Sequence, residues 1–409
     1  MFRVFPRVRW DFFIGVSAIL LSGSILTACN STGGGIRPGL SSGSGQIGAL
    51  PEKVLTPNPS GEVLGNGNVR VALLVPSTIP GGAAAVAQEL RNGAEMAIQD
   101  FGQNRIQVVV KDTKGLAAEA QTKASEALSE GSSLILGPLF AANVSAASGI
   151  TLPANVSMLA FSTDTSVARR GVYLFSYTPQ SDTRRMINYA ASMGRQSIVA
   201  FLPRNAEGGL RGRILRETAG RNRINVKIHE YDRTPEGIEA VLIEGAVSVQ
   251  TSDSIYIPEG GPIPGLLIGG LRRNGVDLPG KQLLGSGAWE SIDFTNANLE
   301  GAIYPGRDVS KFAGFANRYQ SRYGAAPGVQ AALAYDAVTL ASELVRQNGP
   351  SNAFRTRNFE SNRGFQGTTG AFKIRSDGTT DRGLAIYKIG NGSSSLLEPA
   401  ISSFTGRGT

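Results

Sequence analysis

Short runs of apolar and β-branched residues alternate with segments of helical spacing from residue 69 onward. The first runs lie at 69–75, 105–110, 133–136 and 156–161, and apolar residues recur every three or four positions between them. This alternation predicts an α/β protein, with a mostly parallel sheet that carries helices on both faces and is joined by right-handed crossovers.

The pattern starts again after residue 178, so we expect a second unit of the same kind. Its strands are expected at 197–202, 224–231, 254–257, 281–285 and 299–304. Two long helices, near 312–323 and 333–344, should follow. Two short strands, 371–375 and 384–389, stand on either side of the turn sequence Ser376-Asp377-Gly378 and are expected to form a hairpin.

The amino terminus has the features of an export signal. A basic segment precedes an apolar run from Phe12 to Leu26, which is too short to span a bilayer comfortably. The run ends in Leu26-Thr27-Ala28-Cys29, which resembles the lipobox of bacterial lipoproteins. We therefore expect residues 1–28 to be a signal peptide and Cys29 to carry lipid, although a lone cysteine can also be a small core residue.

Residues 29–68 are expected to form a disordered tether behind the lipidated cysteine. The segment is rich in Gly, Ser, Pro and Asn and has no apolar period, so it has little surface to bury. As a flexible coil it would reach roughly 30 to 40 Å. Because Cys29 is the only cysteine, the mature chain would have no internal disulfide.

The residue types argue against an enzyme. The only cysteine is expected to carry lipid, which excludes a Cys-His dyad, and the chain has one histidine, His229, which excludes a His-rich metal site. His229 falls in an alternating strand pattern typical of a half-buried position. No catalytic residue, metal ligand or cofactor is predicted, although a carboxylate pair or a Ser-Lys arrangement would leave no readable signature.

Nine arginines between Arg184 and Arg223 form the densest basic stretch of the chain. Two interpretations stay open, a solvated helix face and a docking surface for an anionic partner. Nucleic acid is not an expected partner, because the chain has an export signal and no aromatic residues interleave with these arginines.

In parallel α/β sheets, ligands bind beyond the carboxyl ends of the strands, where helix N-termini offer free N–H groups. Two loops fit that position here. One leads into a helix near Ala141 and offers Asn143, and the other contains Ser162, Thr163, Asp164 and Thr165. The alternative is that these hydroxyl and carboxylate side chains only cap the local turn.

The loops of the second unit offer fewer side chains for ligand binding than the two loops of the first unit. Its corresponding loops read Glu207-Gly208-Gly209 and Glu259-Gly260-Gly261, and we expect no side chain there to cover a ligand. Trp289 and Glu290 are the bulky candidates. Trp289 would either stack on a ligand or belong to the core.

Several segments together resemble the type I periplasmic binding-protein fold of the leucine/isoleucine/valine-binding branch. They are Gly137-Pro138-Leu139, Ala160-Phe161-Ser162-Thr163-Asp164, YTPQSDTRRMINYAASMG, FANRYQSRYGAAPGVQAALAYDAV and GFQGTTGAFKIRSDGTTDRGLAIYKIG. The resemblance implies two Rossmann-like lobes with a hinge and an interlobe cleft. It implies discontinuous lobes at 69–178 with 306–350 and at 179–305 with 351–392, followed by a tail at 393–409.

The lipobox, the tether and the GFQGTTGAFKIRSDG segment are most similar to the LppC/LpoA-type penicillin-binding protein activators. That resemblance implies a non-catalytic regulator of peptidoglycan synthesis with a cell-wall synthase as partner. Asn30 after the cysteine favours the periplasmic face of the outer membrane. The chain lacks the helical-repeat domain of the best-known activators, which weakens the transfer of their partner.

The alternative is a substrate-binding lipoprotein that delivers a branched-chain type amino acid to an ABC permease. True amino-acid binders usually hold the ligand's carboxylate with a hydroxyl residue in the first loop, where this chain has Ala141 and Ala142. The overall similarity to leucine binders favours transport, and the missing hydroxyl favours the activator.

Overall fold

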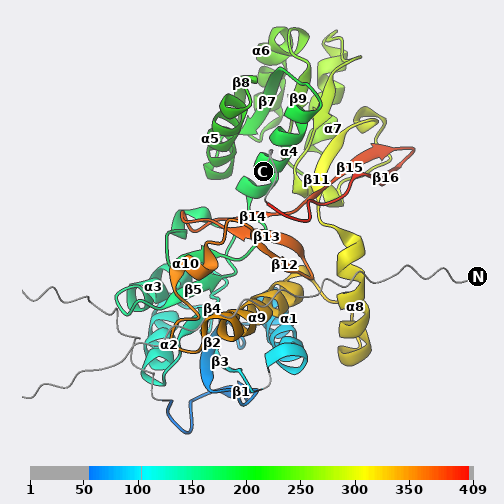
Figure 1. Ribbon diagram of the computed structural model, residues 1–409. Coiled ribbons are helices and arrows are strands. Elements are labelled where there is room, and N and C mark those ends of the chain that lie inside the picture. Colours follow the sequence, from blue (N-terminus) through cyan, green and yellow to red (C-terminus); the bar gives the residue numbers. More distant parts are fainter. Residues whose placement is uncertain (1–54, 103, 405–409) are drawn as a thin grey trace, which may run out of the picture. The chain divides into compact units, whose positions relative to one another are not determined.

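The computed structural model describes residues 55–102 and 104–404, which form three sheets with flanking helices (Figure 1). The first sheet has the order β1-β3-β2-β4-β5-β6 and is parallel except for β1, which pairs antiparallel with β3. Its strands are β1 (Glu62–Leu64), β2 (Val69–Val75), β3 (Ile106–Asp112), β4 (Leu134–Leu136), β5 (Ser157–Ala160) and β6 (Val172–Leu174).

Alternate residues of β2 face two different layers of helices. Val71 and Leu73 belong to the core with α1 (Gly82–Ala97) and α9 (Val329–Asn348). Ala72 and Leu74 belong to the core with α2 (Ala117–Ser129) and α3 (Ala141–Thr151). The continuous apolar run of β2 is therefore explained by burial on both faces of a parallel sheet.

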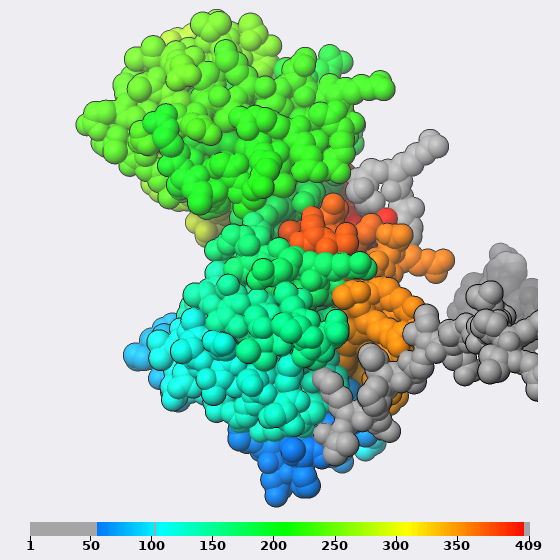
Figure 2. Space-filling view, turned by 90° about the vertical axis from the view of Figure 1, so that its left-hand side faces the viewer, coloured from blue at the N-terminus to red at the C-terminus, as the bar shows by residue number. Residues whose placement is uncertain are grey.

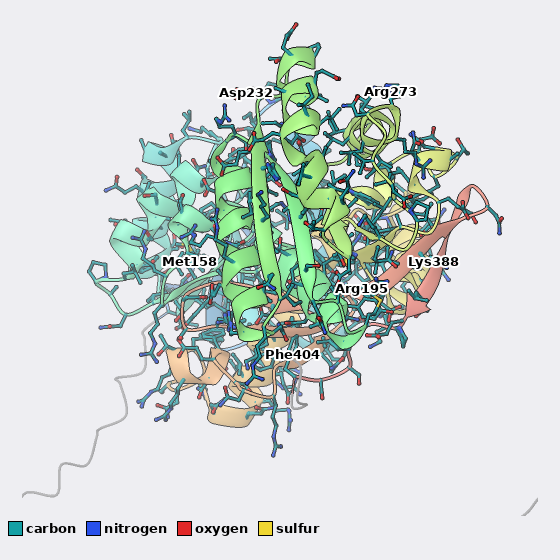
Figure 3. The ribbon with its side chains drawn as sticks, turned by 90° about the horizontal axis from the view of Figure 1, so that it is seen from above. Met158, Arg195, Asp232, Arg273, Lys388 and Phe404 are labelled. Carbon is teal, nitrogen blue, oxygen red and sulfur yellow. The ribbon has the colours of Figure 1, made fainter. Side chains whose placement is uncertain are left out.

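The second sheet has the order β16-β15-β11-β10-β9-β7-β8. Its strands are β7 (Ser197–Pro203), β8 (Asn225–Tyr231), β9 (Ser254–Tyr256), β10 (Gln282–Leu284), β11 (Ile303–Gly306), β15 (Ala385–Gly390) and β16 (Ser393–Glu398). Strands β7 to β11 run parallel, while β15 and β16 pair antiparallel at one edge. In Figure 3, Arg195 before β7 and Asp232 after β8 mark opposite ends of these strands.

Helices cover both faces of the second sheet as well. Ile198 and Ala200 pack with α4 (Pro179–Ser192) and α5 (Ala206–Arg221), whereas Val199 and Phe201 pack with α6 (Pro235–Gln250) and α7 (Ile263–Arg273). The short helices are η1 (Ile98–Gly102), η2 (Thr165–Val167), η3 (Gly287–Ser291), η4 (Ala297–Leu299) and α10 (Thr356–Phe359).

The third sheet consists of β12 (Phe365–Gly367), β13 (Gly370–Ile374) and β14 (Thr380–Arg382). Phe372 and Ile374 lie in the same core as β2, together with Phe354, Phe359 and residues of α8 (Val309–Tyr323). The segment 353–374 therefore packs with the first sheet, whereas the sequence had assigned 351–392 to the second lobe. Only β15 and β16 from this part of the chain join the second sheet.

Three expectations for the ends of the chain need correction. Residues 62–64 of the expected tether form β1, and residues 393–398 of the expected tail form β16. The expected hairpin is also wrong, because the turn at 376–378 joins β13 to β14 and β15 pairs with β11 instead. The signal peptide, Cys29 and the tether up to residue 54 lie outside the described residues.

The fold class predicted from the sequence is confirmed, since both large sheets are mostly parallel and covered by helices on two faces. Within the part of the chain that the structure describes, none of the helices combines the length and the apolarity needed to cross a bilayer.

Candidate functional site

The first candidate edge lies where β4 ends and α3 begins. Gly137 has φ of 85°, and a Cβ there would lie 2.3 Å from the carbonyl oxygen of Leu74, so the tight turn requires glycine. Phe140 occupies the N-cap of α3 and makes no side-chain capping bond. The first N–H groups of α3 are therefore left to bind an anion or a carboxylate.

Asn143 lies in the first turn of α3 and is 1% exposed. Its Nδ2 has no hydrogen-bond partner among the described residues. A buried unpaired amide donor costs about 1–3 kcal/mol, so such donors usually have an acceptor in the functional state. Among the residues predicted from the sequence, Asn143 thus offers an unpaired side-chain donor, and its contact with a ligand stays a prediction.

The second predicted loop follows β5 and lies beside the first, because the Phe161 N–H donates to the Pro138 carbonyl at 3.0 Å. Ser162 is buried and its Oγ accepts a hydrogen bond from the Asp164 N–H at 3.2 Å. Asp164 in turn caps η2 by accepting from the Ser166 N–H at 2.9 Å. Thr163 is exposed and Thr165 is partly buried. Ser162 and Asp164 thus serve the local turn.

Glu259 lies at the edge of the second sheet, in a loop where the sequence was expected to offer no side chain to cover a ligand. It follows β9, its side chain is 7% exposed, and its carboxylate accepts from the Tyr231 hydroxyl and pairs with Arg233 at 2.5 Å. Burial raises the pKa of Glu259 to about 7; the Glu207 carboxylate adds to this rise, and Arg211 opposes it. In the sequence, its position shortly after a predicted parallel strand was the feature that could have marked it as a candidate ligand contact.

Trp289 lies in the core of the second sheet and presents no ring face to a ligand. It is 0% exposed, and its indole N–H donates to the Glu259 carbonyl at 2.9 Å. This agrees with the core interpretation of Trp289. Glu290 is also engaged, because it accepts from the Arg307 N–H at 2.7 Å and pairs with the Arg307 guanidinium at 2.8 Å.

A buried ion pair lies further along the second edge. Arg211 donates to Asp182 at 2.6 Å, and Asp182 also accepts from the Gly287 N–H at 3.1 Å. The hydroxyl of Tyr256, at the end of β9, completes this cluster at 3.0 Å from Thr183. Desolvation lowers the pKa of Arg211, but Asp182, Tyr256 and Glu207 together outweigh it, and the pKa of Arg211 is raised. These groups saturate one another and tie α4 and α5 to the sheet.

Much of the basic stretch is paired within the chain. Besides Arg211, Arg184 pairs with Asp381 and Arg185 with Glu398, which links α4 to the last strands. A further set of pairs lies at the surface, Arg204 with Asp232 and Arg221 with Glu217. The stretch is therefore largely a set of intramolecular contacts and a solvated face.

His229 lies inside the second unit between α6 and the sheet. Its Nδ1 is 3.0 Å from Glu244 and its Nε2 is 3.0 Å from the hydroxyl of Ser248. Although Ser, His and Glu are brought together, Ser248 is 5% exposed and His229 is 3% exposed. The hydroxyl therefore faces the protein interior, where no substrate could reach it.

The segments that pass between the sheets are held by a buried cluster around Arg382 and Asp336. Arg382 is 2% exposed and lies over the rings of Phe175, Tyr177 and Phe372 at 4.6 to 5.2 Å. It donates to the Thr369 hydroxyl at 3.0 Å, and that hydroxyl donates to Asp336. In Figure 2 the orange residues of the third sheet lie against the green residues that follow β6, and the Leu174 N–H donates to the Gly378 carbonyl.

Two mostly parallel sheets, each covered by helices on both faces, define an α/β protein with the architecture of the type I periplasmic binding fold. The family model described as periplasmic binding protein matches residues 68–394. The chain therefore belongs to the periplasmic binding protein family. No curated protein matches it in sequence.

Solved structures agree with this fold. Leucine binding protein LivK from Thermotoga maritima is 20% identical, with a TM-score of 0.53 over 81% of this chain and 98% of that one. A periplasmic ligand-binding protein of a branched-chain amino acid ABC transporter from Burkholderia xenovorans is 14% identical. Its TM-score is 0.61, over 83% of this chain and 97% of that one. A solute-binding protein from Rhodopseudomonas palustris, solved with benzoate, is 17% identical. Its TM-score is 0.53, over 83% of this chain and 98% of that one.

Proposed function

We propose that this chain is a non-catalytic periplasmic binding module that takes a small amino-acid-like ligand and serves an ABC permease. The buried, unpaired Nδ2 of Asn143 in the first turn of α3 carries the proposal. The uncapped start of α3 would bind the ligand's carboxylate, and Asn143 would add one hydrogen bond. Glu259, at the corresponding edge of the second sheet, would face the ligand's amine.

The ligands named for the similar structures support this choice. Leucine is named for the Thermotoga protein and benzoate for the Rhodopseudomonas protein. Both molecules join a carboxylate to an apolar body, which is the chemistry that a free helix N-terminus in an otherwise apolar site would recognise.

A thermal-shift experiment on residues 30–409 tests the proposal with three matched probes. Leucine should stabilise the protein, by about 2.7 kcal/mol at a hundred times its dissociation constant. Isocaproate, which lacks the amine, and isoamylamine, which lacks the carboxylate, should stabilise it less. If neither branched-chain amino acids nor carboxylates of this size raise the melting temperature, the proposal is wrong.

Substitution of Asn143 then tests whether its side chain contacts the ligand. Asn143→Ala should weaken leucine binding by about 10- to 100-fold, because one hydrogen bond to a charged group is worth about 1.5–3 kcal/mol. Asn317→Ala, at an exposed position on α8, is the matched control and should bind as the wild type does. Equal weakening in both variants would contradict the assigned contact.

A second candidate function has one observation in its favour. Ile243 and Val247 lie one turn apart on α6 and are 67% and 70% exposed, so they offer an apolar surface for a protein partner. This would suit an activator of penicillin-binding proteins that acts through protein contacts. Capture of a purified cell-wall synthase that is lost in Ile243→Glu/Val247→Glu, but kept in Val309→Glu, would favour this function over transport.

The proposed location follows from the sequence. Cleavage before Cys29 and acylation of its thiol would anchor the module to a membrane, and Asn30 favours the periplasmic face of the outer membrane over the inner one. The family assignment supports a periplasmic position.

A further inference from the structure

A cavity of about 800 Å³ lies at the amino edge of the first sheet, opposite the edge where a ligand was proposed above. It is lined by the starts of β2 and β5, at Val69, Arg70, Val156 and Ser157, and by residues 350–357 between α9 and α10. The seven residues of β2 separate the two edges by roughly 20 Å. The cavity is therefore distinct from the candidate site on α3.

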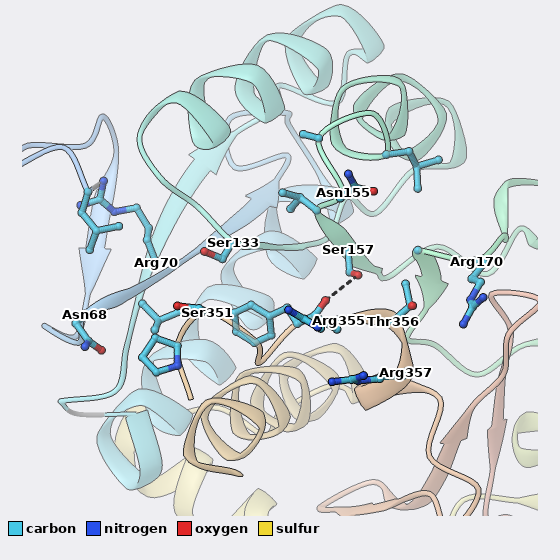
Figure 4. A pocket seen from close by; sticks show the side chains of 18 residues that line it. Asn68, Arg70, Ser133, Asn155, Ser157, Arg170, Ser351, Arg355, Thr356 and Arg357 are labelled. Atoms are coloured by element: carbon cyan, nitrogen blue, oxygen red, sulfur yellow. Dashed lines mark hydrogen bonds between the residues drawn. The ribbon is translucent and has the colours of Figure 1, made fainter. Parts of the chain in front are cut away.

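The walls of this cavity are cationic. Four arginines line it, and none of its lining residues is an aspartate or a glutamate. In Figure 4, Arg70 lies on the left of the pocket, Arg170 on the right, and Arg355 and Arg357 between them. The lining thus has the charge of a site for an anion.

Neighbouring carboxylates offset part of this charge, at Arg170 and Arg70, and none pairs with Arg355 or Arg357 among the described residues. Glu360 is engaged by Arg170 at 2.9 Å and by the Tyr173 hydroxyl at 2.7 Å. Glu130 pairs with Lys111 at 2.8 Å, and Arg70 donates to its backbone carbonyl while its carboxylate also attracts the Arg70 guanidinium. The guanidinium of Arg70 is otherwise bound to the neutral oxygens of Thr56 and Gln107.

Two of the arginines are free to bind a ligand. The guanidinium groups of Arg355 and Arg357 make no hydrogen bond or ion pair with any described residue, and Nε of Arg355 is buried without a partner. The backbone that carries them is fixed, since Ser157 donates from its hydroxyl to the Phe354 carbonyl at 3.2 Å (Figure 4). A planar guanidinium without a partner in the protein suits a carboxylate or a phosphate.

Apolar side chains complete the lining. Leu55, Leu152, Val156 and Phe354 contribute to the walls, and the volume falls in the range of about 300–1,000 Å³ found for small-molecule sites. An inorganic anion would leave these walls exposed to water, whereas an anion with an apolar chain would cover them.

We propose that this cavity is a second binding site, which takes an organic anion with an apolar body, a carboxylate or phosphate head on an aliphatic chain. The head pairs with Arg355 and Arg357, and the chain lies against Leu152 and Phe354. A soluble fatty carboxylate and an anionic lipid headgroup share this chemistry. The site does not depend on the ligand proposed for the α3 edge.

Calorimetric titration of residues 30–409 with decanoate, below its micelle concentration, tests the site. Decyl maltoside, which is neutral, and decylamine, which is cationic, serve as comparison probes and should bind at least tenfold more weakly. In a parallel arm, the protein is sedimented with phosphatidylcholine vesicles that contain or lack phosphatidylglycerol. Binding to decanoate indicates a soluble ligand, and binding only to anionic vesicles indicates a lipid headgroup.

Three variants place the binding in this cavity. Arg355→Gln/Arg357→Gln should lower affinity at least tenfold, while Arg272→Gln/Arg273→Gln, an exposed pair at the end of α7, should not. Ala154→Trp, which fills the cavity and keeps every charge, should also abolish binding. Saturating leucine should leave decanoate binding unchanged. The proposal would be overturned if the protein bound neither decanoate nor the anionic vesicles. Equal losses of affinity in the two double arginine variants would also overturn it.

Discussion

Asp336 shows how one buried carboxylate holds the third sheet to α9. It accepts hydrogen bonds from the N–H and hydroxyl groups of both Thr368 and Thr369, with distances of 2.7 Å and 2.9 Å to the two N–H groups. Burial raises the pKa of Asp336, and these donors oppose the rise. Four donors on two oxygens leave no room for a donor group on this side chain.

Replacement of Asp336 by asparagine should therefore destabilise the protein by about 3 kcal/mol, because the amide NH₂ would face hydrogen-bond donors and leave them unpaired. Urea unfolding of Asp336→Asn against the wild type measures this loss. Asp277→Asn, at an exposed position before β10, is the matched control and should change stability by less than about 0.5 kcal/mol. Equal effects of the two substitutions would contradict this account of Asp336.

Glu259 should give the protein a pH-dependent stability. Its pKa rises from 4.5 to about 7 on folding, so the folded protein holds a proton that the unfolded chain releases between these values. The stabilising contribution is complete below pH 4.5 and is lost as the pH rises to about 7. We expect a loss of about 2 kcal/mol, less than the whole shift implies, because Arg233 favours the charged form.

Urea unfolding at several pH values from 4.5 to 8 measures the expected dependence of stability on Glu259. The difference in stability between wild type and Glu259→Gln should change across this window, since glutamine does not ionise. The exposed Glu239→Gln on α6 should follow the wild-type curve at every pH. A pH-independent difference between Glu259→Gln and wild type would show that Glu259 does not titrate in this range.

The pairing of α1 with α9 depends on a close backbone approach at Gly93. A Cβ at this position would lie 1.9 Å from the carbonyl oxygen of Ala331, so the two helices would have to move apart. Gly93→Ala should lower stability by about 2 kcal/mol despite the better helix propensity of alanine. Gly314→Ala, on α8 with open space around it, should be neutral or stabilising in the same thermal melts. Stabilisation of both variants would show that the helices can separate without loss.

Elements with a strong apolar pattern could be predicted from the sequence, and polar or very short ones could not. The runs at 69–75 and 197–202 are confirmed as β2 and β7, because burial on both faces requires continuous apolar residues. β16, with the sequence SSSLLE, is mostly exposed at a sheet edge and carries no such pattern. α7 was missed because its glycines and prolines hide a helical face that packs on Leu242.

The candidate site could be predicted only in part. Asn143 could be named as a candidate because its loop follows a strand and starts a helix, which is a local pattern. Glu259 was discounted because two glycines follow it, and its contact with Tyr231, which ends a strand 28 positions earlier in the chain, is not a local pattern. The buried state of Trp289 likewise depends on the packing of distant segments around it.

For the complete protein, the proposed anchor makes a direct prediction. Wild-type protein expressed in a bacterial host should sediment with membranes and carry an acyl mass at Cys29. Cys29→Ala should lose the acyl mass and should not be processed at residue 28, because the lipobox processing step requires the cysteine thiol. Membrane fractionation and mass spectrometry measure both properties. An unmodified Cys29 in the wild type would contradict the lipoprotein assignment.

The path of the chain through its sheets also constrains how the protein can be made. Between Leu64 and Glu398 the chain leaves the first sheet after β6, returns after β11 and leaves again after β14. A ribosome therefore finishes β7 to β11 before it has supplied α9 and Phe372, which the earlier core needs. The cores of the second sheet also include Ile386 and Ile389 of β15, so both halves are completed only by late segments and we expect them to fold late in synthesis.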